Sequence, residues 1–215
     1  MSNLNKKRQI IKDILEASFE AGACHISSAL SCVDILIDLY YNILKDGDVF
    51  IFSKASGVAT LYSILADKGY FPKEKLSKYL HDYPLPSKEV PGVVWSGGSL
   101  GMGLGIACGI ALGSKRKVYC LLSDGECQEG STMEAVLFAK QHKLDNLYVI
   151  IDNNGYQALG KTDDILKIDW SFFKKLPHCK IVKTVKGGNL KFLQGTKGHY
   201  HNLNKKELTK ALCQI

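Results

Sequence analysis

Two kinds of hydrophobic pattern alternate along the chain, and each predicts a different element. Helical patterns occupy residues 10–21, 31–44, 57–68, 73–79, 106–112, 131–142 and 205–212. Short unbroken apolar runs, which are typical of buried strands, occupy residues 49–52, 118–122 and 147–151, and residues 181–185 are predicted as a late strand. Because helices separate the strands, this order predicts an α/β fold. We expect a parallel sheet flanked by helices, with ligands bound at the carboxyl ends of the strands.

Composition places these elements in one ordinary globular domain. The 215 residues are 46% hydrophobic and 23% charged, values that are typical of soluble proteins. No apolar run approaches the roughly 20 residues of a membrane span, and the N-terminus lacks the apolar core of a secretory signal. Seven cysteines are scattered without a CxxC spacing, which favours reduced thiols in the cytoplasm over a zinc site or disulfides.

The formal net charge of +7 is concentrated near the two ends of the chain. Nucleic-acid binding is one reading of such a charge, but no basic motif here is interleaved with aromatic residues. We therefore interpret the basic residues as a solvated face, or as a contact for an acidic partner subunit or a phosphorylated ligand. Neither nucleic acid nor a membrane is a predicted partner.

Two predicted strands each end directly in a polar turn. Asp124 follows the strand at 118–122, and Asn154 follows the strand at 147–151. Either turn alone is common after a strand. Together, at the ends of two buried strands, they place two hard oxygen ligands at one edge of the sheet. Such ligands suit Mg²⁺ or Ca²⁺ and, through the ion, a diphosphate.

With these motifs in this order, the chain resembles the N-terminal, diphosphate-binding half of transketolase, a thiamine-diphosphate (ThDP) enzyme. The family's early Gly-His region, its Ser-Leu-Gly-x-Gly segment, its Gly-Asp-Gly…Asn signature and its Lys-Thr-Val-Lys-Gly strand end all have counterparts. They are residues 24–31, 99–103, 123–125 with Asn154, and 183–187. Since the resemblance covers nearly the whole chain, we treat residues 1–215 as a single diphosphate-binding domain.

The resemblance implies a set of cofactor and metal ligands. Asp124, Asn154 and the backbone carbonyl of Tyr156 are expected to bind the Mg²⁺ or Ca²⁺ ion. The residues expected to contact the cofactor are Gly98, Ser99, Leu100, Gly125, Glu126 and Asn154.

The resemblance also implies three catalytic residues. His25 and His199 match active-site histidines that serve substrate hydroxyls and proton transfer, or the diphosphate. Glu129 matches a glutamate that reaches across a dimer interface to support the glutamate that activates the aminopyrimidine. Simpler readings exist for each, because a lone histidine is usually a surface or core residue, and Glu129, like Glu126, can complement a helix dipole.

The first departure from the family is the lack of the second of its two cofactor-binding domains. Transketolase places its cofactor between two domains, and the second domain carries the glutamate that protonates the aminopyrimidine ring. The 215 residues contain no such domain. We therefore expect a separate C-terminal-half subunit, with active sites at the interfaces of an α2β2 heterotetramer.

Further departures are two substitutions and a shortened segment. Ser56 and Leu85 stand where the family usually has histidines. Proton-transferring groups contribute roughly 10²–10⁴-fold in rate, so their loss puts the ordinary ketose-phosphate reaction in doubt more than ThDP binding. The family also carries a further strand and helix after the metal-binding asparagine, where only residues 161–180 intervene here.

The sequence therefore predicts a transketolase-like transferase subunit. With its partner, it is expected to pass a two-carbon ketol or related unit from a ketose or 2-keto donor to an aldehyde. The expected substrate is a small molecule of the sugar-phosphate or nucleotide-sugar type. Two alternatives stay open: the α-type E1 subunit of a 2-oxo acid dehydrogenase, which shares the metal motif, and a non-catalytic copy that acts as a regulatory binding module.

Overall fold

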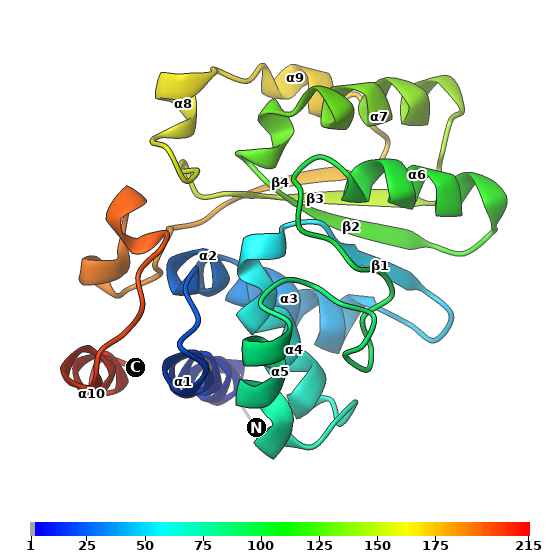
Figure 1. The fold of residues 1–215 in the computed structure, drawn as a ribbon. Coiled ribbons are helices and arrows are strands. Elements are labelled where there is room, and N and C mark those ends of the chain that lie inside the picture. The colour runs from blue at the N-terminus through cyan, green and yellow to red at the C-terminus, as the bar shows by residue number, and fades with distance from the viewer. Residues whose placement is uncertain (1–2) are drawn as a thin grey trace.

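The computed structural model describes residues 3–215, which form a four-stranded sheet between two layers of helices (Figure 1). The strands are β1 (Val49–Phe52), β2 (Val118–Ser123), β3 (Leu147–Asn153) and β4 (Cys179–Lys183). The helices are α1 (Asn3–Ala21), α2 (Ile26–Ser31), α3 (Val33–Asp38), the π-helical turn η1 (Leu39–Ile43), α4 (Val58–Asp67), α5 (Leu76–Asp82), α6 (Gly103–Gly113), α7 (Gly130–Gln141), α8 (Thr162–Ile165), α9 (Trp170–Phe173) and α10 (Lys205–Leu212). None of the helices among these residues is long and apolar enough to cross a membrane.

The sheet has the order β1-β2-β3-β4, and every neighbouring pair is parallel. The predicted fold class is therefore confirmed. β2 and β3 pair with Ser123 opposite Asp152, so the turns that follow the two strands lie side by side. This register brings Asp124 and Asn154 to the same edge of the sheet.

Two hydrophobic cores lie on opposite faces of the sheet. Helices α1–α5 cover one face and α6–α9 cover the other (Figure 1). Along β2, Tyr119 and Leu121 belong to the first core, whereas Val118, Cys120 and Leu122 belong to the second. A strand buried on both faces needs apolar residues at every position, which is why this strand reads as an unbroken apolar run.

The helix predicted at residues 31–44 is wrong in its start and its continuity. The structure has α2, a break at Cys32 with φ −100°, then α3 and η1. The Ser31 hydroxyl would suit a helix N-cap, but it instead donates to a carboxylate oxygen of Asp152 at 2.6 Å. Helix α2 begins before the predicted start at residue 31, immediately after His25.

Strand β4 begins and ends two residues earlier than the predicted 181–185. It pairs directly with β3, and the segment between them holds only α8 and α9, of four residues each. Unlike the other three strands, β4 is half-buried or exposed along its length. Its outer edge has no strand partner among the residues that the structure describes.

Candidate functional site

Asp124 and Asn154 occupy adjacent turns at the carboxyl end of the sheet. Asp124 is fully buried, and its Oδ2 and Oδ1 accept hydrogen bonds from the backbone N–H of Gly155 at 2.5 Å and of Gly125 at 2.9 Å. Asn154 is 8% exposed, and its Oδ1 accepts from the backbone N–H of Tyr156 at 3.0 Å. Burial raises the pKa of Asp124 to about 6, although the Gly155 amide opposes this shift. The two predicted ligands are thus linked through one backbone segment.

The donors at this edge fit a hard divalent cation. They are the carboxylate of Asp124, the amide oxygen of Asn154 and the nearby backbone carbonyl of Tyr156. Within residues 3–215, no group of three or more His, Cys, Asp or Glu side chains could hold a metal, so a cation would depend on this mixed oxygen set. Mg²⁺ and Ca²⁺ accept such ligands and complete their shells with phosphate oxygens or water.

The carboxylate of Asp152, at the end of β3, joins several site-bearing segments. Its Oδ2 lies 2.8 Å from the Lys54 ammonium and accepts from the Ser31 hydroxyl at 2.6 Å. Its Oδ1 accepts from the Thr184 hydroxyl. Ser31 is also 3.4 Å from the side-chain nitrogen of Asn154. One buried carboxylate therefore ties α2, the turn after β1 and the end of β4 to the metal-binding turn.

Lys54 is committed to this internal network. Its Nζ donates to the backbone oxygen of Ser28 at 2.7 Å and to the hydroxyl of Ser31 at 2.9 Å, besides its ion pair with Asp152. An ammonium has three donors, so all of them are used inside the protein. Burial is the largest influence and lowers the pKa of Lys54, but the combined effects of Asp152, Cys32 and Asp124 raise the pKa above its ordinary value.

Lys186 carries a second buried ammonium, only 2% exposed. Its Nζ donates to the backbone oxygen of Gln157 at 3.1 Å and to Nδ1 of His199 at 2.9 Å. Burial, and then the charge of Lys54, lower its pKa to about 8, while Asp124 opposes the shift. The group remains mostly charged at neutral pH, and it can neutralise part of a diphosphate bound at this edge.

His25 and His199 lie together, with ring centroids 4.7 Å apart in an edge-to-face arrangement. Nδ1 of His25 is 2.9 Å from the backbone oxygen of His199. A carbonyl only accepts, so this Nδ1 carries the proton and Nε2 is an acceptor. Nδ1 of His199 accepts from Lys186, which leaves its Nε2 protonated. Burial lowers the pKa of both rings, to about 3 for His199, so at neutral pH the pair offers one acceptor and one donor.

The backbone around the histidines is held in an unusual conformation. His25 has φ 66°, in the left-handed region that costs a non-glycine residue of the order of 1–3 kcal/mol. Its N–H donates to the backbone oxygen of His199 at 3.1 Å, and the Ser27 hydroxyl donates to that of Gly198 at 2.8 Å. These bonds stabilise the strained turn and fix the two rings relative to each other.

The glycine-rich loop packs tightly on its neighbours. A Cβ on Gly98 would meet Cδ1 of Leu85 at 2.8 Å, and one on Gly101, where φ is 83°, would meet the hydroxyl of Ser131 at 2.2 Å. Between these contacts, residues 98–100 remain half-buried or exposed. The backbone of residues 98–100 is thus open to a ligand, while Gly98 and Gly101 pack closely against neighbouring side chains.

The two glutamates predicted as site residues have opposite environments. Glu126 is fully buried, and its Oε1 accepts from the Ser53 hydroxyl and from the backbone N–H of Gly101 at 2.9 Å. Burial raises its pKa to about 6, while these bonds lower it. Glu129 is exposed at the start of α7. Glu129 is therefore open to contact with a neighbouring molecule. Glu126 was expected to contact the cofactor, but its carboxylate is occupied by bonds within the chain.

Ser56 and Leu85, which are expected to stand where the family has two histidines, do not supply the chemistry of an imidazole. The Ser56 hydroxyl lies 2.7 Å from that of Ser28. Leu85 is 38% exposed beside Gly98, and its backbone oxygen accepts from the hydroxyl of Tyr62 at 2.9 Å. Neither side chain can carry a charge or relay a proton as an imidazole does.

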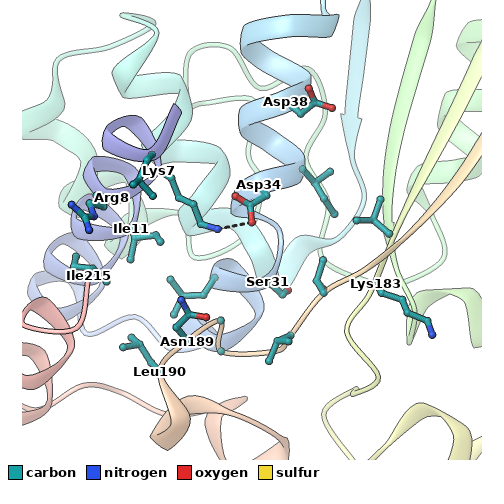
Figure 2. Close-up of a pocket in the computed structure, with 18 of the residues that line it drawn as sticks. Lys7, Arg8, Ile11, Ser31, Asp34, Asp38, Lys183, Asn189, Leu190 and Ile215 are labelled. Atoms are coloured by element: carbon teal, nitrogen blue, oxygen red, sulfur yellow. Dashed lines mark hydrogen bonds and ion pairs between the residues drawn. The ribbon is translucent and has the colours of Figure 1, made fainter. Parts of the chain in front are cut away.

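A cavity of about 670 Å³ lies apart from these residues, between α1, α3 and β4 (Figure 2). The ion pair of Lys7 with Asp34, at 2.7 Å, links α1 to α3 across it (Figure 2). Of the Asp152 network, Ser31 and Thr184 reach its wall, but no predicted ligand or histidine does. We therefore place the functional site at the strand ends and not in this cavity.

Sequence reasoning missed three charged residues of the site: Lys54, Asp152 and Lys186. Asp152 lies two residues before Asn154, Lys186 lies inside the matched segment 183–187, and Lys54 is the second residue after β1. For Lys54 and Asp152, a charged residue just after an unbroken apolar run was the available signal. Its partners, however, are distant in sequence, so only the fold shows what each charge does.

Comparisons with known proteins agree with this geometry. The family described as "Thiamine pyrophosphate enzyme, C-terminal TPP binding domain" matches residues 75–212. The chain is 36% identical over 253 residues to one of the subunits of apulose-4-phosphate transketolase from Actinobacillus succinogenes, covering 94% of this chain and 91% of the relative. It is 30% identical over 252 residues to the protein of the same name from Phocaeicola vulgatus, covering 94% and 87%.

Among solved structures, transketolase from Leishmania mexicana has the same fold, with a TM-score of 0.88 at 19% identity. The match covers 100% of this chain and 41% of that one, so the chain spans about two fifths of the solved enzyme. The alignment with the Actinobacillus relative runs over 253 positions, whereas this chain has 215 residues. That relative therefore carries residues that have no counterpart here.

We predict that Asp152→Ala will lower the free energy of unfolding by about 3–5 kcal/mol, because it leaves the Lys54 ammonium buried without its partner. Urea unfolding followed by circular dichroism measures this loss. The double variant Lys54→Met/Asp152→Ala removes both charges and should recover a large part of the stability. If the double variant is as unstable as the single one, the unpaired ammonium of Lys54 is not the cause of the loss.

Proposed function

The chain belongs to the transketolase family of thiamine pyrophosphate enzymes, as the cofactor-binding subunit of a split enzyme, and from this we propose how it binds its cofactor, which donor it takes and how it assembles. The family reaction is ThDP-dependent ketol transfer, so the predicted transferase function is confirmed. The Actinobacillus and Phocaeicola relatives are both named as transketolase subunits, which favours transketolase over the 2-oxo acid dehydrogenase alternative.

The metal and diphosphate are proposed to bind where the two strand-end turns meet. Asp124, Asn154 and the carbonyl of Tyr156 would hold Mg²⁺ or Ca²⁺, and Lys186 would add its positive charge. The hydrogen bond from the N–H of Gly155 to Asp124 carries this proposal, because it joins the two turns into one oxygen-lined edge. ThDP, once bound, supplies the carbon nucleophile that cleaves the bond beside the donor's ketone.

The ring system of the cofactor is proposed to lie against the backbone of residues 98–100, with Gly125 beneath the diphosphate. The support is steric. A Cβ on Gly125 would meet Cβ of Gln157 at 2.9 Å, and one on Gly98 would meet Leu85 at 2.8 Å. At both places glycine lets the backbone pack closely against the chain's own side chains, and residues 98–100 stay half-buried or exposed, so that their backbone is open to a ligand.

The histidines are proposed to handle the donor's oxygens. Nε2 of His25 is an acceptor and can take up a hydroxyl proton, whereas Nε2–H of His199 can donate a hydrogen bond to a developing negative charge. The bonds that fix these tautomers support the assignment. Glu129, exposed at the start of α7, would reach the active site of a neighbouring subunit.

The donor is proposed to be a ketose phosphate other than xylulose 5-phosphate. Ser56 and Leu85 remove two imidazoles from the site, which changes the groups available to the donor's hydroxyls. The Actinobacillus and Phocaeicola relatives are both named for apulose 4-phosphate, and we propose that sugar phosphate, or a close analogue, as the donor for this chain.

The assembly is proposed to be an α2β2 heterotetramer in which two copies of this chain meet through α6 and α7. These helices lie side by side on the outer layer (Figure 1) and expose Met102, Leu112, Leu137 and Phe138, each at least 40% accessible. Large exposed apolar groups of this kind mark association surfaces. The C-terminal-half subunit would then complete each active site. The unpaired state of all seven cysteines agrees with the proposed location in the cytoplasm.

The outward glycines of α6 also fit a close helix–helix contact. A Cβ on Gly105, Gly109 or Gly113 would have no atom within 4 Å in this chain. These positions are four residues apart, so they lie along one face of the helix. A second copy could therefore approach that face more closely than leucines or alanines would permit.

The cofactor assignment predicts that Asp124→Ala will weaken Mg²⁺-dependent ThDP binding by more than about 100-fold, beyond the usual cost of losing an outer-shell partner. Titration calorimetry on the chain alone and with its partner subunit measures this. Asp163→Ala, which changes an exposed carboxylate on α8, should bind like the unaltered chain. Equal affinities for Asp124→Ala and the unaltered chain would show that the metal assignment is wrong.

The donor assignment predicts that the assembled pair will turn over apulose 4-phosphate at least about tenfold faster than xylulose 5-phosphate. Ser56→His should raise the xylulose 5-phosphate rate, because it restores a group of a type that contributes roughly 10²–10⁴-fold when it transfers a proton. Initial rates with a common aldehyde acceptor compare the two donors. Robust turnover of xylulose 5-phosphate by the unaltered pair contradicts the proposal.

The assembly proposal predicts that Gly109→Leu will block the contact between two copies while leaving the chain folded. Leucine favours an exposed helix over glycine by about 1 kcal/mol, so the variant should melt at the same or a higher temperature. Light scattering should show the α2β2 mass halved. Lys12→Leu adds the same side chain to the exposed face of α1 and should assemble normally. A full-size assembly of the Gly109 variant rules out this interface.

A further inference from the structure

Glu126 is a fully buried carboxylate next to the metal-binding turn, yet it lies outside the proposed ligand set. It begins a short 3-10 turn between β2 and α7, at residues 126–128. A carboxylate removed from water needs several hydrogen bonds. The partners of Glu126 show which parts of the site depend on it.

The carboxylate bonds to three separate segments. Oε1 accepts from the Ser53 hydroxyl at the end of β1 and from the N–H of Gly101 in the glycine-rich loop at 2.9 Å. Oε2 lies 3.4 Å from the N–H of Ser123 at the end of β2. The backbone of Glu126 is fixed as well, because its N–H donates to the Ser123 hydroxyl at 3.1 Å and its carbonyl accepts from Thr132 at 2.9 Å.

The hydrogen bond from Gly101 to Glu126 lies where the glycine-rich loop packs most closely against the rest of the chain. A Cβ on Gly101 would meet Cβ of Glu129 at 2.9 Å, and one on Gly103 would meet the Ser53 hydroxyl at 2.2 Å. The loop is therefore pressed against the start of α7 and the end of β1 at this point. Residues 98–100, immediately before it, are half-buried or exposed.

We propose that Glu126 is a positioning residue that fixes the glycine-rich loop relative to the metal-binding turn. It does not touch the cofactor. It holds residues 98–100 at a set distance from Asp124, so that the surface for the cofactor's rings and the ligands of its metal form one rigid frame. The proposal rests on the proposed cofactor site, and it replaces the expected contact of Glu126 with ThDP.

Removal of the carboxylate has a specific consequence. In Glu126→Ala, the N–H of Gly101 and the hydroxyl of Ser53 lose their acceptor, and the loop is released from β1 and β2. Glu126→Gln keeps an oxygen that can accept both bonds, so the loop should stay in place. The two variants therefore separate the role of the acceptor from that of the negative charge.

Loop position can be read without any cofactor through Trp95. This side chain lies at the start of the loop, where its Nε1 donates to the backbone oxygen of Phe52 at 3.2 Å and a Cβ on Gly97 would meet its ring at 2.3 Å. Trp170 is the second tryptophan, so Trp170→Phe leaves Trp95 as the only reporter. Iodide quenching of its fluorescence measures how freely solvent reaches the loop.

The test compares Glu126→Ala, Glu126→Gln and the control Val136→Ala in the full-length chain. Val136 is fully buried on α7, and its truncation destabilises the protein through a cavity without touching the loop. We expect Glu126→Ala to increase the quenching of Trp95 and to weaken ThDP binding about 10- to 100-fold in the assembled enzyme, as misplacement by about 1 Å can do. The other two variants should match the unaltered chain in both measurements.

Two outcomes overturn the proposal. One is unchanged Trp95 quenching in Glu126→Ala. The other is that Val136→Ala, at an equal loss of melting temperature, weakens ThDP binding as much, which would assign the effect to stability alone. If the unaltered chain fails to bind ThDP with Mg²⁺, the proposed cofactor site is wrong, while the quenching experiment still decides whether Glu126 positions the loop.

Discussion

The ion pair between Asp152 and Lys54, both removed from water, holds the functional end of the sheet together. Burying two charges is costly, and well-packed apolar residues would often stabilise a fold as much. The pair is better understood through what it connects. With the hydroxyls of Ser31 and Thr184, it joins α2, the end of β1, the end of β3 and the end of β4. These are the segments that lead to His25, the metal-binding turn and Lys186.

A second buried carboxylate, that of Glu126, connects further segments of the site. Ser53 and Lys54 are consecutive residues after β1, yet Ser53 bonds to Glu126 and Lys54 pairs with Asp152. The end of β1 is thus bound both to the glycine-rich loop and to the histidine side of the site. The oxygens of both carboxylates are occupied by bonds within the chain. The groups proposed to bind a ligand are the oxygens of the metal-binding turns, the ammonium of Lys186 and the paired histidines.

The limits of sequence reasoning follow from the same network. Asp124 and Asn154 were predictable because each lies in the polar turn that ends an unbroken apolar run, and two parallel strands bring such positions together. Lys54 and Asp152 are almost a hundred residues apart in sequence, and no local sequence pattern predicts their ion pair. The break at Cys32 could not be predicted for a similar reason. Ser31 is a residue type that favours a helix N-cap, but its hydroxyl donates instead to Asp152, which is distant in sequence. The histidine pair likewise depends on a left-handed turn at His25 that periodicity does not show.

The network also explains how a shortened chain can keep the site. Residues 161–180 contain no strand before β4, so β4 pairs directly with β3, and this pairing brings Thr184 to Asp152. β4 is half-buried or exposed along its length, its outer edge lacks a strand partner among the described residues, and it lines part of the cavity of about 670 Å³. The cavity is not separate from the site, because Ser31 and Thr184 line it and also bond to Asp152. The bonds to Asp152 therefore fix one wall of the cavity as well as the segments that carry the proposed ligands.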